Sequence, residues 1–510
     1  MPKIAIIDIG SRSVNLEIHS IEGEGFKQIY YNTITTHLGQ GISREGELDP
    51  EAVNRTKAVL AEYKKIIDGF DEVDKFKDFA DPITVIVICT AAVRAARDRE
   101  EFVAMAQQVL GEEAEVRVIS GEEEAIYTFL GVINSTAMNE FVMIDTGGTS
   151  TEIALIKDRK LQRYASIPWG AVNITEKFFN SPVVPPHRFS EAVHTCLPQI
   201  EGLEWIAQCK NLPIIACGSS VRNLALAERH KKIAKSSSLH GYMINYSNVA
   251  FMVKQIGKMS AQARVDKLGI KKSNAETIIG GMVPLMALFR ATGSRRMIVS
   301  EFGVMYGVFY EQYMRINKKV SAVEPDVLAC SIRRILDRYN CDYSHADMVE
   351  SLSLSMYEQT QKVHHLGDRF KNILSVAARL HDIGEYIGYH NHHEHSFYLI
   401  NHSDVYGLEH QDKFYAAIAA GHHRKKKMHF DWVRYWRLIS RRTLTDLKNL
   451  GEIIHIAEII AEREPSATGV KLQIAPQTIQ VMIEKPAKDR GEVAYGQSVG
   501  KLFGRKTYVV

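Results

Sequence analysis

A short polar motif occurs twice in this sequence, each time directly after an apolar run with β-strand character. It reads DIGSRS at residues 8–13 and DTGGTS at residues 145–150, so both copies follow the pattern D-x-G-x-x-S. Each copy is followed by a second strand-like run, at 14–20 and at 152–157. A repeated strand–turn–strand unit indicates that the chain contains two duplicated lobes.

Around these motifs the sequence alternates short β-rich runs with helical stretches as far as about residue 310, which is typical of an α/β fold. Strand-like runs lie at 4–9, 14–20, 26–34, 83–89 and 115–120, and helical ones at 94–110 and 122–134. From about residue 318 the pattern becomes helical, with helices predicted at 322–339, 344–364, 370–385, 411–423, 437–450 and 452–462. The segments 470–474 and 478–484 again have β character.

The length of the chain and these changes of pattern together predict four domains. We expect lobe I at 1–135 and lobe II at 136–315. An all-α domain should follow at 318–463, and a small β-containing C-terminal α+β domain at 464–510.

Composition excludes several classes of protein. The 510 residues carry a net charge of only +3, and basic and aromatic residues do not alternate as in a sequence-reading nucleic-acid module. No apolar run approaches the roughly 18 residues that cross a bilayer, and no signal-like core follows the N-terminus. The six cysteines form no CxxC pair. We therefore expect a cytoplasmic protein with reduced cysteines, no membrane association and no sequence-specific nucleic-acid binding.

Each D-x-G-x-x-S turn is suited to binding phosphate. A Gly-rich turn exposes successive backbone N–H groups and small hydroxyls, and such an array binds phosphate oxygens. The aspartates that end the two strands, Asp8 and Asp145, can hold Mg²⁺ directly or through water. Ordinary hairpin turns also use Gly and Asp, but two copies in equivalent contexts favour the phosphate-binding interpretation.

Two further features carry charge at places where the chain changes from strand to helix. Three glutamates at 122–124 open a predicted helix, where they either stabilise the helix dipole by ~0.3–1 kcal/mol each or supply a general base. Arg94 follows the strand at 83–89 and suits either a bidentate phosphate contact or the surface of a helix. The residues alone leave both pairs of alternatives open.

Taken in order, the segments IDIGSRS, TAAVRAA, VISGEEEA and IDTGGTSTE resemble the Ppx/GppA family of exopolyphosphatases and guanosine pentaphosphate phosphatases. The resemblance covers essentially the whole chain. It implies a pair of duplicated actin/Hsp70-like (ribonuclease H-like) lobes with the active site in the cleft, and an HD-like helical domain behind them. It also implies Mg²⁺-dependent removal of a terminal phosphate, with Mn²⁺ as an alternative ion, and a homodimer.

The resemblance assigns roles to individual residues. Glu124 matches the glutamate that activates the attacking water, with its neighbour Glu123 as the fallback, and Arg94 matches the phosphate-binding arginine. The implied metal ligands are Asp8, Asp145 and Glu152. The implied phosphate-binding positions are Gly10, Ser11, Arg12, Ser13, Gly147, Gly148, Thr149, Ser150 and Ser219.

The sequence departs from the family pattern at four places. Arg12 replaces the usual Asn of the first loop and either adds a phosphate contact or fills the cleft, and Thr149 takes the place of a third glycine in the second loop. A third loop reads CGSSV at 217–221, and VMYG at 304–307 replaces a common L-R-E-G motif. These departures leave the substrate preference open, whereas the acidic residues of the core are all present.

The helical part is rich in histidine, since residues 311–510 hold 14 of the 20 histidines. The segment His381-Asp382-Ile383-Gly384 resembles the signature of HD phosphohydrolases, in which His and carboxylate ligands bind one or two divalent metals. The ligands predicted on this basis are His364, His381, Asp382, His395, His423 and Glu458. Because the family's version of this domain usually looks degenerate, we expect a structural or substrate-binding role ahead of a second metal-bearing site.

A basic run follows at 424–427 and reads RKKK. Such a run is commonly a solvated face, but it would also attract a polyanion through the salt-sensitive physics that governs nucleic acids. The first expectation for function is therefore an exopolyphosphatase that releases orthophosphate from chain ends. The alternatives are hydrolysis of the 5′-terminal phosphate of guanosine pentaphosphate and a non-catalytic polyphosphate or nucleotide sensor, with an ATPase or sugar kinase ranked below them.

Overall fold

The structure, a computed structural model, describes residues 1–510 except 24, 43–45, 76–82, 180, 231–237, 319, 425–427, 429–434, 436–437, 485–497 and 510. It divides into two compact units. Among the described residues, the N-terminal unit lies within 1–230 and 239–327, and the C-terminal unit lies within 328–509.

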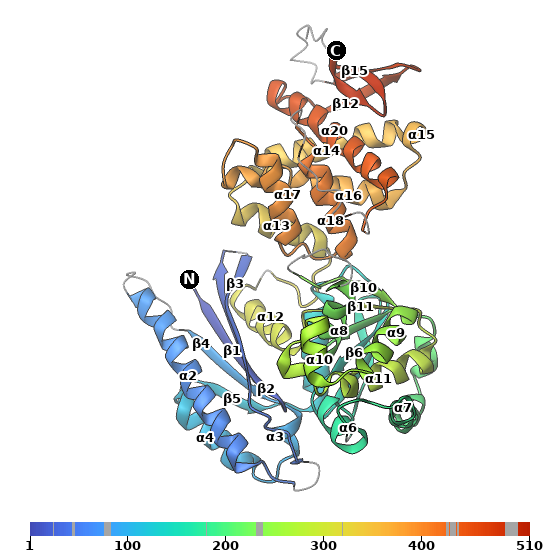
Figure 1. Cartoon of the computed structure of the whole chain (residues 1–510). Coiled ribbons are helices and arrows are strands. Elements are labelled where there is room, and N and C mark those ends of the chain that lie inside the picture. The colour runs from blue at the N-terminus through green and yellow to red at the C-terminus, as the bar shows by residue number, and fades with distance from the viewer. Residues whose placement is uncertain are drawn as a thin grey trace. The chain divides into compact units, whose positions relative to one another are not determined.

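The first lobe of the N-terminal unit is built on a five-stranded sheet with the order β3-β2-β1-β4-β5 (Figure 1). Strands β1 to β3 form an antiparallel meander, whereas β4 and β5 run parallel to β1. The strands are β1 (Lys3–Ile9), β2 (Ser13–Glu22), β3 (Gly25–Thr35), β4 (Thr84–Cys89) and β5 (Glu115–Val118). Its helices include α2 (Pro50–Lys75), α3 (Ala91–Ala95), α4 (Arg99–Leu110) and α5 (Gly121–Ile133).

The second lobe repeats this arrangement. Its six-stranded sheet has the order β10-β11-β9-β6-β7-β8, so β8-β7-β6-β9-β11 corresponds strand by strand to β3-β2-β1-β4-β5. The strands are β6 (Phe141–Thr146), β7 (Thr151–Lys157), β8 (Lys160–Ile167), β9 (Ile214–Cys217), β10 (Met243–Asn245) and β11 (Arg296–Val299). The topology confirms the duplication and the mixed α/β class that the repeated motif predicts.

Helices pack on the second sheet to form the largest core cluster of the N-terminal unit. They are α6 (Ala171–Phe178), α7 (Pro186–Glu201), α8 (Ser219–His230), α9 (Tyr246–Gly257), α10 (Ala261–Leu268) and α11 (Ile278–Thr292), with short 3-10 turns η1 (Ile206–Cys209) and η2 (Lys272–Asn274). Helix α11 is buried along most of its length, which its apolar sequence requires.

Residues of β1 alternate between two cores, as side chains of a strand buried on both faces must. Ala5, Ile7 and Ile9 pack with α2 and α4 on one face of the sheet. Ile4 and Ile6 lie on the other face, which is covered by α12 (Val304–Ile316). Helix α12 lies within the range predicted for lobe II, yet it packs against the sheet of lobe I.

Helix α5 makes the reciprocal exchange. It follows the last strand of the first sheet, but Phe129, Val132 and Ile133 pack against the second sheet. Each lobe therefore contributes the helix after its last parallel strand to the interior between the two sheets. The exchange ties the lobes together through apolar burial rather than through a single connecting segment.

Glycines allow α5 and α12 to cross at very short range. A Cβ atom at Gly307 would lie 1.8 Å from the carbonyl oxygen of Tyr127, and one at Gly131 would lie 2.5 Å from the carbonyl oxygen of Gly303. Only glycine permits such an approach, because every other residue carries a Cβ. The sequence Val304-Met305-Tyr306-Gly307 is thus a packing contact in this structure.

The C-terminal unit combines helices with a four-stranded sheet of order β12-β13-β15-β14. The helices are α13 (Val327–Arg338), α14 (Tyr343–Gln359), α15 (Gln361–His364), α16 (Asp368–Arg379), α17 (His392–His402), α18 (His410–Gly421) and α20 (Arg441–Arg463), with η3 (Ile383–Tyr386). The strands are β12 (Gly469–Ile474), β13 (Thr478–Glu484), β14 (Ser498–Leu502) and β15 (Arg505–Val509). Sheet and helices share one core, to which Val470, Ile479 and Leu502 contribute.

The sequence pattern predicts two helices, one on each side of Gly451, whereas the structure has the single helix α20. The helix runs through this glycine, where a Cβ would lie 2.7 Å from the Cβ of His422 and 2.8 Å from the carbonyl oxygen of Ala419. Gly451 therefore marks a close crossing of α18 and α20 and does not end a helix, a distinction that depends on the neighbour.

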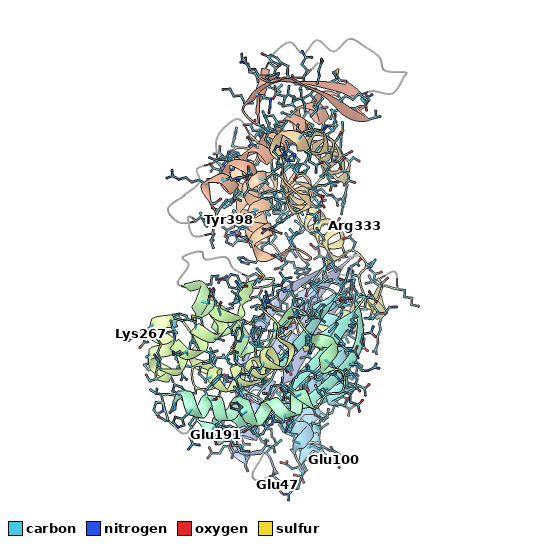
Figure 2. All side chains as sticks on the ribbon, turned by 90° about the vertical axis from the view of Figure 1, so that its right-hand side faces the viewer. Glu47, Glu100, Glu191, Lys267, Arg333 and Tyr398 are labelled. Atoms are coloured by element: carbon cyan, nitrogen blue, oxygen red, sulfur yellow. The ribbon has the colours of Figure 1, made fainter. Side chains whose placement is uncertain are left out.

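Several charged side chains of the helices lie at the surface. Figure 2 labels Glu100 on α4, Glu191 on α7 and Lys267 on α10, all exposed at the surface. Within the described part of the chain, no helix has the length and apolar character needed to cross a membrane.

Candidate functional site

The N-terminus of α5 is closed by a reciprocal cap. The Ser120 hydroxyl accepts a hydrogen bond from the backbone N–H of Glu123 at 3.1 Å, and the Glu123 carboxylate accepts one from the N–H of Ser120 at 2.7 Å. These hydrogen bonds lower the pKa of Glu123. Glu123, predicted as the fallback base, is therefore occupied in starting the helix.

Glu124 is the next residue, and it points to Arg94. Nη1 of Arg94 donates to Oε2 of Glu124 at 2.9 Å and to the carbonyl oxygen of Ile119 at 2.8 Å. The side chain of Glu124 is 12% exposed and that of Arg94 25%. Burial raises the pKa of Glu124, although Arg94 opposes this rise. A carboxylate with a raised pKa beside a guanidinium matches a general base held near a phosphate-binding group.

The two strand-ending aspartates lie in equivalent positions. Asp8 pairs with Asn15 in the register of β1 and β2, and Asp145 pairs with Glu152 in the register of β6 and β7. Asn15 donates to Asp8 at 3.0 Å. Burial raises the pKa of Asp8 to about 7, assisted by the negative charges of Glu124 and Asp145.

Glu152 occupies the most unfavourable electrostatic position of the four acids. It is 1% exposed and accepts a hydrogen bond from the Ser166 hydroxyl at 2.8 Å. Burial and the charges of Glu124 and Asp145 raise its pKa well above the ordinary range. The pKa of Asp145 is also raised by burial, while Arg222 and a long contact from Thr128 at 3.5 Å oppose the shift.

These acids fit a divalent cation. Oδ1 of Asp8 is buried and has no hydrogen-bond partner among the described residues, although a buried carboxylate oxygen normally requires one. The charges of Glu124 and Asp145 raise the pKa values of both Asp8 and Glu152, so a shared positive charge would stabilise the ionised acids. Oxygen-only donors are those that Mg²⁺ prefers, often with intervening waters.

The two glycine-rich turns contact one another. The hydroxyls of Ser11 and Thr149 are 2.9 Å apart, and a Cβ at Gly148 would lie 2.7 Å from the Cβ of Ser11. Each turn is closed by the same hydrogen bond, from Gly10 N to Ser13 O and from Gly147 N to Ser150 O, both at 3.0 Å. The structure thus brings the predicted phosphate loops together.

Arg12 reaches from the first loop to the second lobe. Its Nη1 donates to the hydroxyl of Thr277 at 2.7 Å, and burial lowers its pKa to about 10. The side chain of Arg12 therefore joins the first loop to the second lobe.

The third loop packs against Asp145. Gly218 has a φ of +97°, and a Cβ there would lie 2.7 Å from the carbonyl oxygen of Thr146 and 3.2 Å from Oδ1 of Asp145. Ser219, a predicted phosphate ligand, accepts a hydrogen bond from Asn274 at 2.7 Å. Arg222, which no motif in the sequence singles out, supplies positive charge to Asp145.

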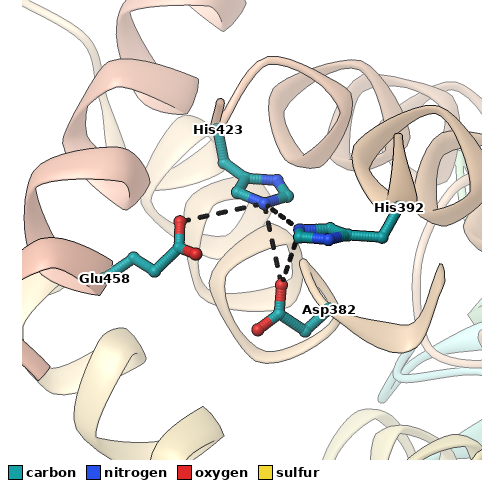
Figure 3. Close-up of side chains that lie close together, drawn as sticks. All are labelled: Asp382, His392, His423 and Glu458. Carbon is teal, nitrogen blue, oxygen red and sulfur yellow. Dashed lines mark hydrogen bonds and ion pairs between the residues drawn. The ribbon is translucent and has the colours of Figure 1, made fainter. Parts of the chain in front are cut away.

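The C-terminal unit holds a second cluster of titratable side chains (Figure 3). Two groups of potential metal ligands occur among the described residues and share Asp382. The first is Asp382, His392, His423 and Glu458, and the second is His345, His381 and Asp382. Oδ1 of Asp382 lies 3.2 Å from Nε2 of His392 and 3.6 Å from Nε2 of His423.

Two of the six residues predicted for this cluster lie outside it. Both ring nitrogens of His364 bond to the backbone, Nε2 to Tyr357 O at 2.9 Å and Nδ1 to Leu366 N at 2.9 Å. His395 lies on α17 and belongs to neither ligand group of the described chain. His392 and His345 take these places instead, because the fold of the helices decides which of many nearby histidines converge. Of the basic run, only Arg424 is described, and 425–427 lie outside the described residues.

Comparisons with known proteins agree with this architecture. A model of the Ppx/GppA phosphatase family matches residues 17–315, and one of Ppx/GppA phosphatase, domain III, matches residues 327–481. The guanosine-5′-triphosphate,3′-diphosphate pyrophosphatase of Pseudoalteromonas translucida is 25% identical over 437 residues, which cover 84% of this chain and 82% of that protein. The protein of the same name from Photobacterium profundum is 25% identical over 417 residues, or 81% of this chain and 78% of that protein.

Solved structures are similar over about three fifths of the chain. The Aquifex aeolicus Ppx/GppA family member has a TM-score of 0.51 at 25% identity and covers 62% of this chain and 99% of its own. An exopolyphosphatase from Cytophaga hutchinsonii has a TM-score of 0.55 at 18% identity and covers 63% of this chain and 100% of its own. The latter likeness concerns the fold alone.

Proposed function

Because this chain belongs to the Ppx/GppA phosphatase family, we propose that it hydrolyses the terminal phosphoanhydride bond of guanosine pentaphosphate and releases orthophosphate. The observation that carries the proposal is the Arg94–Glu124 pair, which lies among three further buried carboxylates beside two facing glycine-rich turns. This arrangement combines a base, a phosphate-binding cation and a cation-binding acid cluster in one cleft.

The nucleotide replaces polyphosphate as the leading substrate. On motifs alone polyphosphate is the first expectation, because both substrates end in the same phosphoanhydride group. The curated relatives that cover more than four fifths of the chain are named for the guanosine nucleotide, and they support that substrate better. Polyphosphate is kept as the comparison substrate, since the family includes both activities by name.

The chain's own residues would carry the reaction as follows. The terminal phosphate lies between the turns at Gly10 and Gly147, with backbone N–H groups and Arg94 as donors to its oxygens. Glu124 accepts a proton from a water molecule whose oxygen forms a bond to the terminal phosphorus. The bond from that phosphorus to the bridging oxygen breaks, and the bridging oxygen leaves with the shortened nucleotide. Positioning and charge neutralisation supply most of the rate enhancement in such a transfer.

We propose that Asp8, Asp145 and Glu152 hold Mg²⁺ or Mn²⁺. When bound, the ion would neutralise charge on the phosphate oxygens. From the family resemblance we also propose a cytoplasmic homodimer, and an actin-like arrangement of the two lobes. The HD-like character of the helical domain is part of the same proposal.

One experiment tests the function and its alternatives. Orthophosphate release by the full-length protein is measured with guanosine pentaphosphate and with long-chain polyphosphate, each with Mg²⁺ and with EDTA. We expect faster release from the nucleotide, and its loss in EDTA. Faster release from polyphosphate would reverse the substrate assignment. Release from both substrates no faster than with Glu124→Gln, despite measurable binding, would make the protein a sensor.

A further inference from the structure

In the histidine cluster of the C-terminal unit, several hydrogen-bond acceptors face one another. Nδ1 of His392 lies 3.1 Å from Tyr389 O, and Nδ1 of His423 lies 2.6 Å from Ala420 O. A carbonyl oxygen carries no proton, so each Nδ1 must donate it. In a neutral imidazole the lone pair then sits on Nε2, and the two Nε2 atoms lie only 2.9 Å apart.

Carboxylate oxygens surround this pair of nitrogens. Nε2 of His423 lies 3.6 Å from Oδ1 of Asp382 and 3.8 Å from Oε2 of Glu458. Both of these oxygens are buried and lack a hydrogen-bond partner among the described residues, and Glu458 as a whole is only 4% exposed. Arg424 donates to Nε2 of His392 alone, so the acceptors of His423, Asp382 and Glu458 repel one another unless a cation lies between them.

The second oxygen of Asp382 faces a similar group. Nε2 of His381 lies 3.2 Å and Nε2 of His345 lies 3.5 Å from Oδ2 of Asp382. Nδ1 of His381 lies 2.7 Å from the carbonyl oxygen of Ala378, so its Nε2 also carries the lone pair. This Nε2 is buried and has no hydrogen-bond partner in the described chain.

We propose that the C-terminal unit is a centre for divalent transition-metal ions, built around the shared carboxylate of Asp382. The ligands of the first ion are Asp382, His392, His423 and Glu458. The ligands of a second, more weakly held ion are Asp382, His345 and His381. This centre is chemically distinct from the oxygen-only acid cluster of the N-terminal unit.

The distances suit such ions. Ligand atoms that lie about 2.0–2.2 Å from one metal, at tetrahedral or octahedral angles, are roughly 2.9–3.6 Å from each other. The separations of 2.9, 3.2, 3.6 and 3.8 Å within the first group cover this range and slightly exceed it. Backbone carbonyls that accept from Nδ1 are the second contacts usual for metal-bound histidines. Two imidazoles with two carboxylates favour Mn²⁺, Fe²⁺, Co²⁺ or Zn²⁺ over Mg²⁺.

Arg424 gives the rim of the centre a positive charge. Its Nε lies 3.2 Å from Nε2 of His392, and its guanidinium lies 5.4 Å from the centre of the Tyr389 ring. This donor satisfies His392 alone and leaves the acceptors of Asp382, His423 and Glu458 facing each other. If a metal ion binds to His392 in place of the Arg424 guanidinium, the guanidinium would lie beside that ion. An anion such as inorganic phosphate could then contact both the ion and the guanidinium.

Metal titration of the full-length protein tests this centre. Chelator-stripped protein is titrated with Co²⁺ in excess Mg²⁺, and binding is followed by visible absorption and by metal analysis after gel filtration. We expect two equivalents, the first bound at least tenfold more tightly. His423→Gln and the nearly isosteric Glu458→Gln should each weaken the first equivalent at least tenfold. His345→Gln should weaken the second alone.

Matched controls separate this centre from the cleft. His395→Gln, on the same helix as His392 but outside both groups, should bind Co²⁺ as the unaltered protein does, and so should Glu124→Gln. The Glu458→Gln variant keeps the result decisive if His423→Gln unfolds. Absence of bound Co²⁺, or equal binding by Glu458→Gln and the unaltered protein, would overturn the proposal. A single equivalent that His345→Gln leaves unchanged would remove the second ion.

Discussion

Arg94 and Glu124, which are 30 residues apart in the sequence, form an ion pair of 2.9 Å. The pair joins the short helix after β4 to the first turn of α5. The pKa of Glu124 is subject to two opposing effects, since burial raises it and the guanidinium lowers it. Activity at a given pH should therefore depend on both residues together.

Substitution Arg94→Gln should shift the pH profile of hydrolysis. Without the guanidinium the pKa of Glu124 rises further, so the acidic limb of kcat/KM should move to higher pH. KM should also rise roughly 10- to 100-fold, because a charge-assisted hydrogen bond to phosphate contributes about 1.5–3 kcal/mol. The check is kcat/KM against pH for both proteins. An unchanged acidic limb would show that Glu124 is not the group that titrates.

Substitution Glu124→Gln should abolish most hydrolysis while substrate binding persists. The loss should be about 10²- to 10⁴-fold in kcat, the usual contribution of a general base. Glu123→Ala is the matched control, because it removes only the carboxylate that accepts from Ser120 N in the cap of α5 and does not touch Arg94. It should cost about 0.3–1 kcal/mol in the free energy of unfolding and leave kcat within a few-fold. The reverse order of effects would assign the base to Glu123.

Stability of the metal-free protein should fall as the pH rises through the range that Asp8 titrates. Its pKa is raised from 3.8 to about 7 in the folded chain. The unfolded chain therefore loses this proton first, and the folded state is progressively disfavoured between about pH 4 and pH 7. Denaturant unfolding in EDTA across this range gives the slope. Asp8→Asn should reduce the slope, and Mg²⁺ should stabilise the unaltered protein more at pH 8 than at pH 5.

A methyl group at the crossing of α5 and α12 should destabilise the N-terminal unit. Gly307→Ala places a Cβ 1.8 Å from the Tyr127 carbonyl oxygen, so the helices must separate. We expect a loss of about 1–3 kcal/mol or more in the free energy of unfolding, as in other overpacked cores. Gly69→Ala on α2 is the control, since no atom lies within 4 Å of its added Cβ. That variant should gain about 0.5–1 kcal/mol from helix propensity.

Local pattern was sufficient for the turns and for most helices and strands. The D-x-G-x-x-S motif predicts a strand that ends in Asp and a glycine turn; each strand in fact ends one residue after its Asp, at Ile9 and at Thr146, and the turn follows. The sequence predicts the acidic start of α5, but it does not predict which glutamate caps the helix and which pairs with Arg94. Ser120 is three residues before Glu123 and one turn before Glu124, so only the cap geometry shows which carboxylate remains for chemistry.

The histidine cluster shows the same limit more sharply. His381, Asp382, His423 and Glu458 were predicted from a signature and its order, and they do converge. The signature does not predict His392 and His345, and His364 and His395, which it does predict, belong to neither ligand group of the described residues. The region offers many histidines within a few residues of each other, and their helical phase and the helix crossings decide which ring nitrogens meet.

The amino-acid sequence by itself determined the duplication, the α/β class of the first part and the acidic and glycine residues of the cleft, because these depend on local spacing and turn chemistry. Tertiary structure decided that α5 and α12 exchange lobes and that Arg222 supports Asp145. It also decided that Asp382 is shared by two groups of histidines. These relationships join residues far apart in the chain, and burial of apolar surface rather than local pattern brings them together.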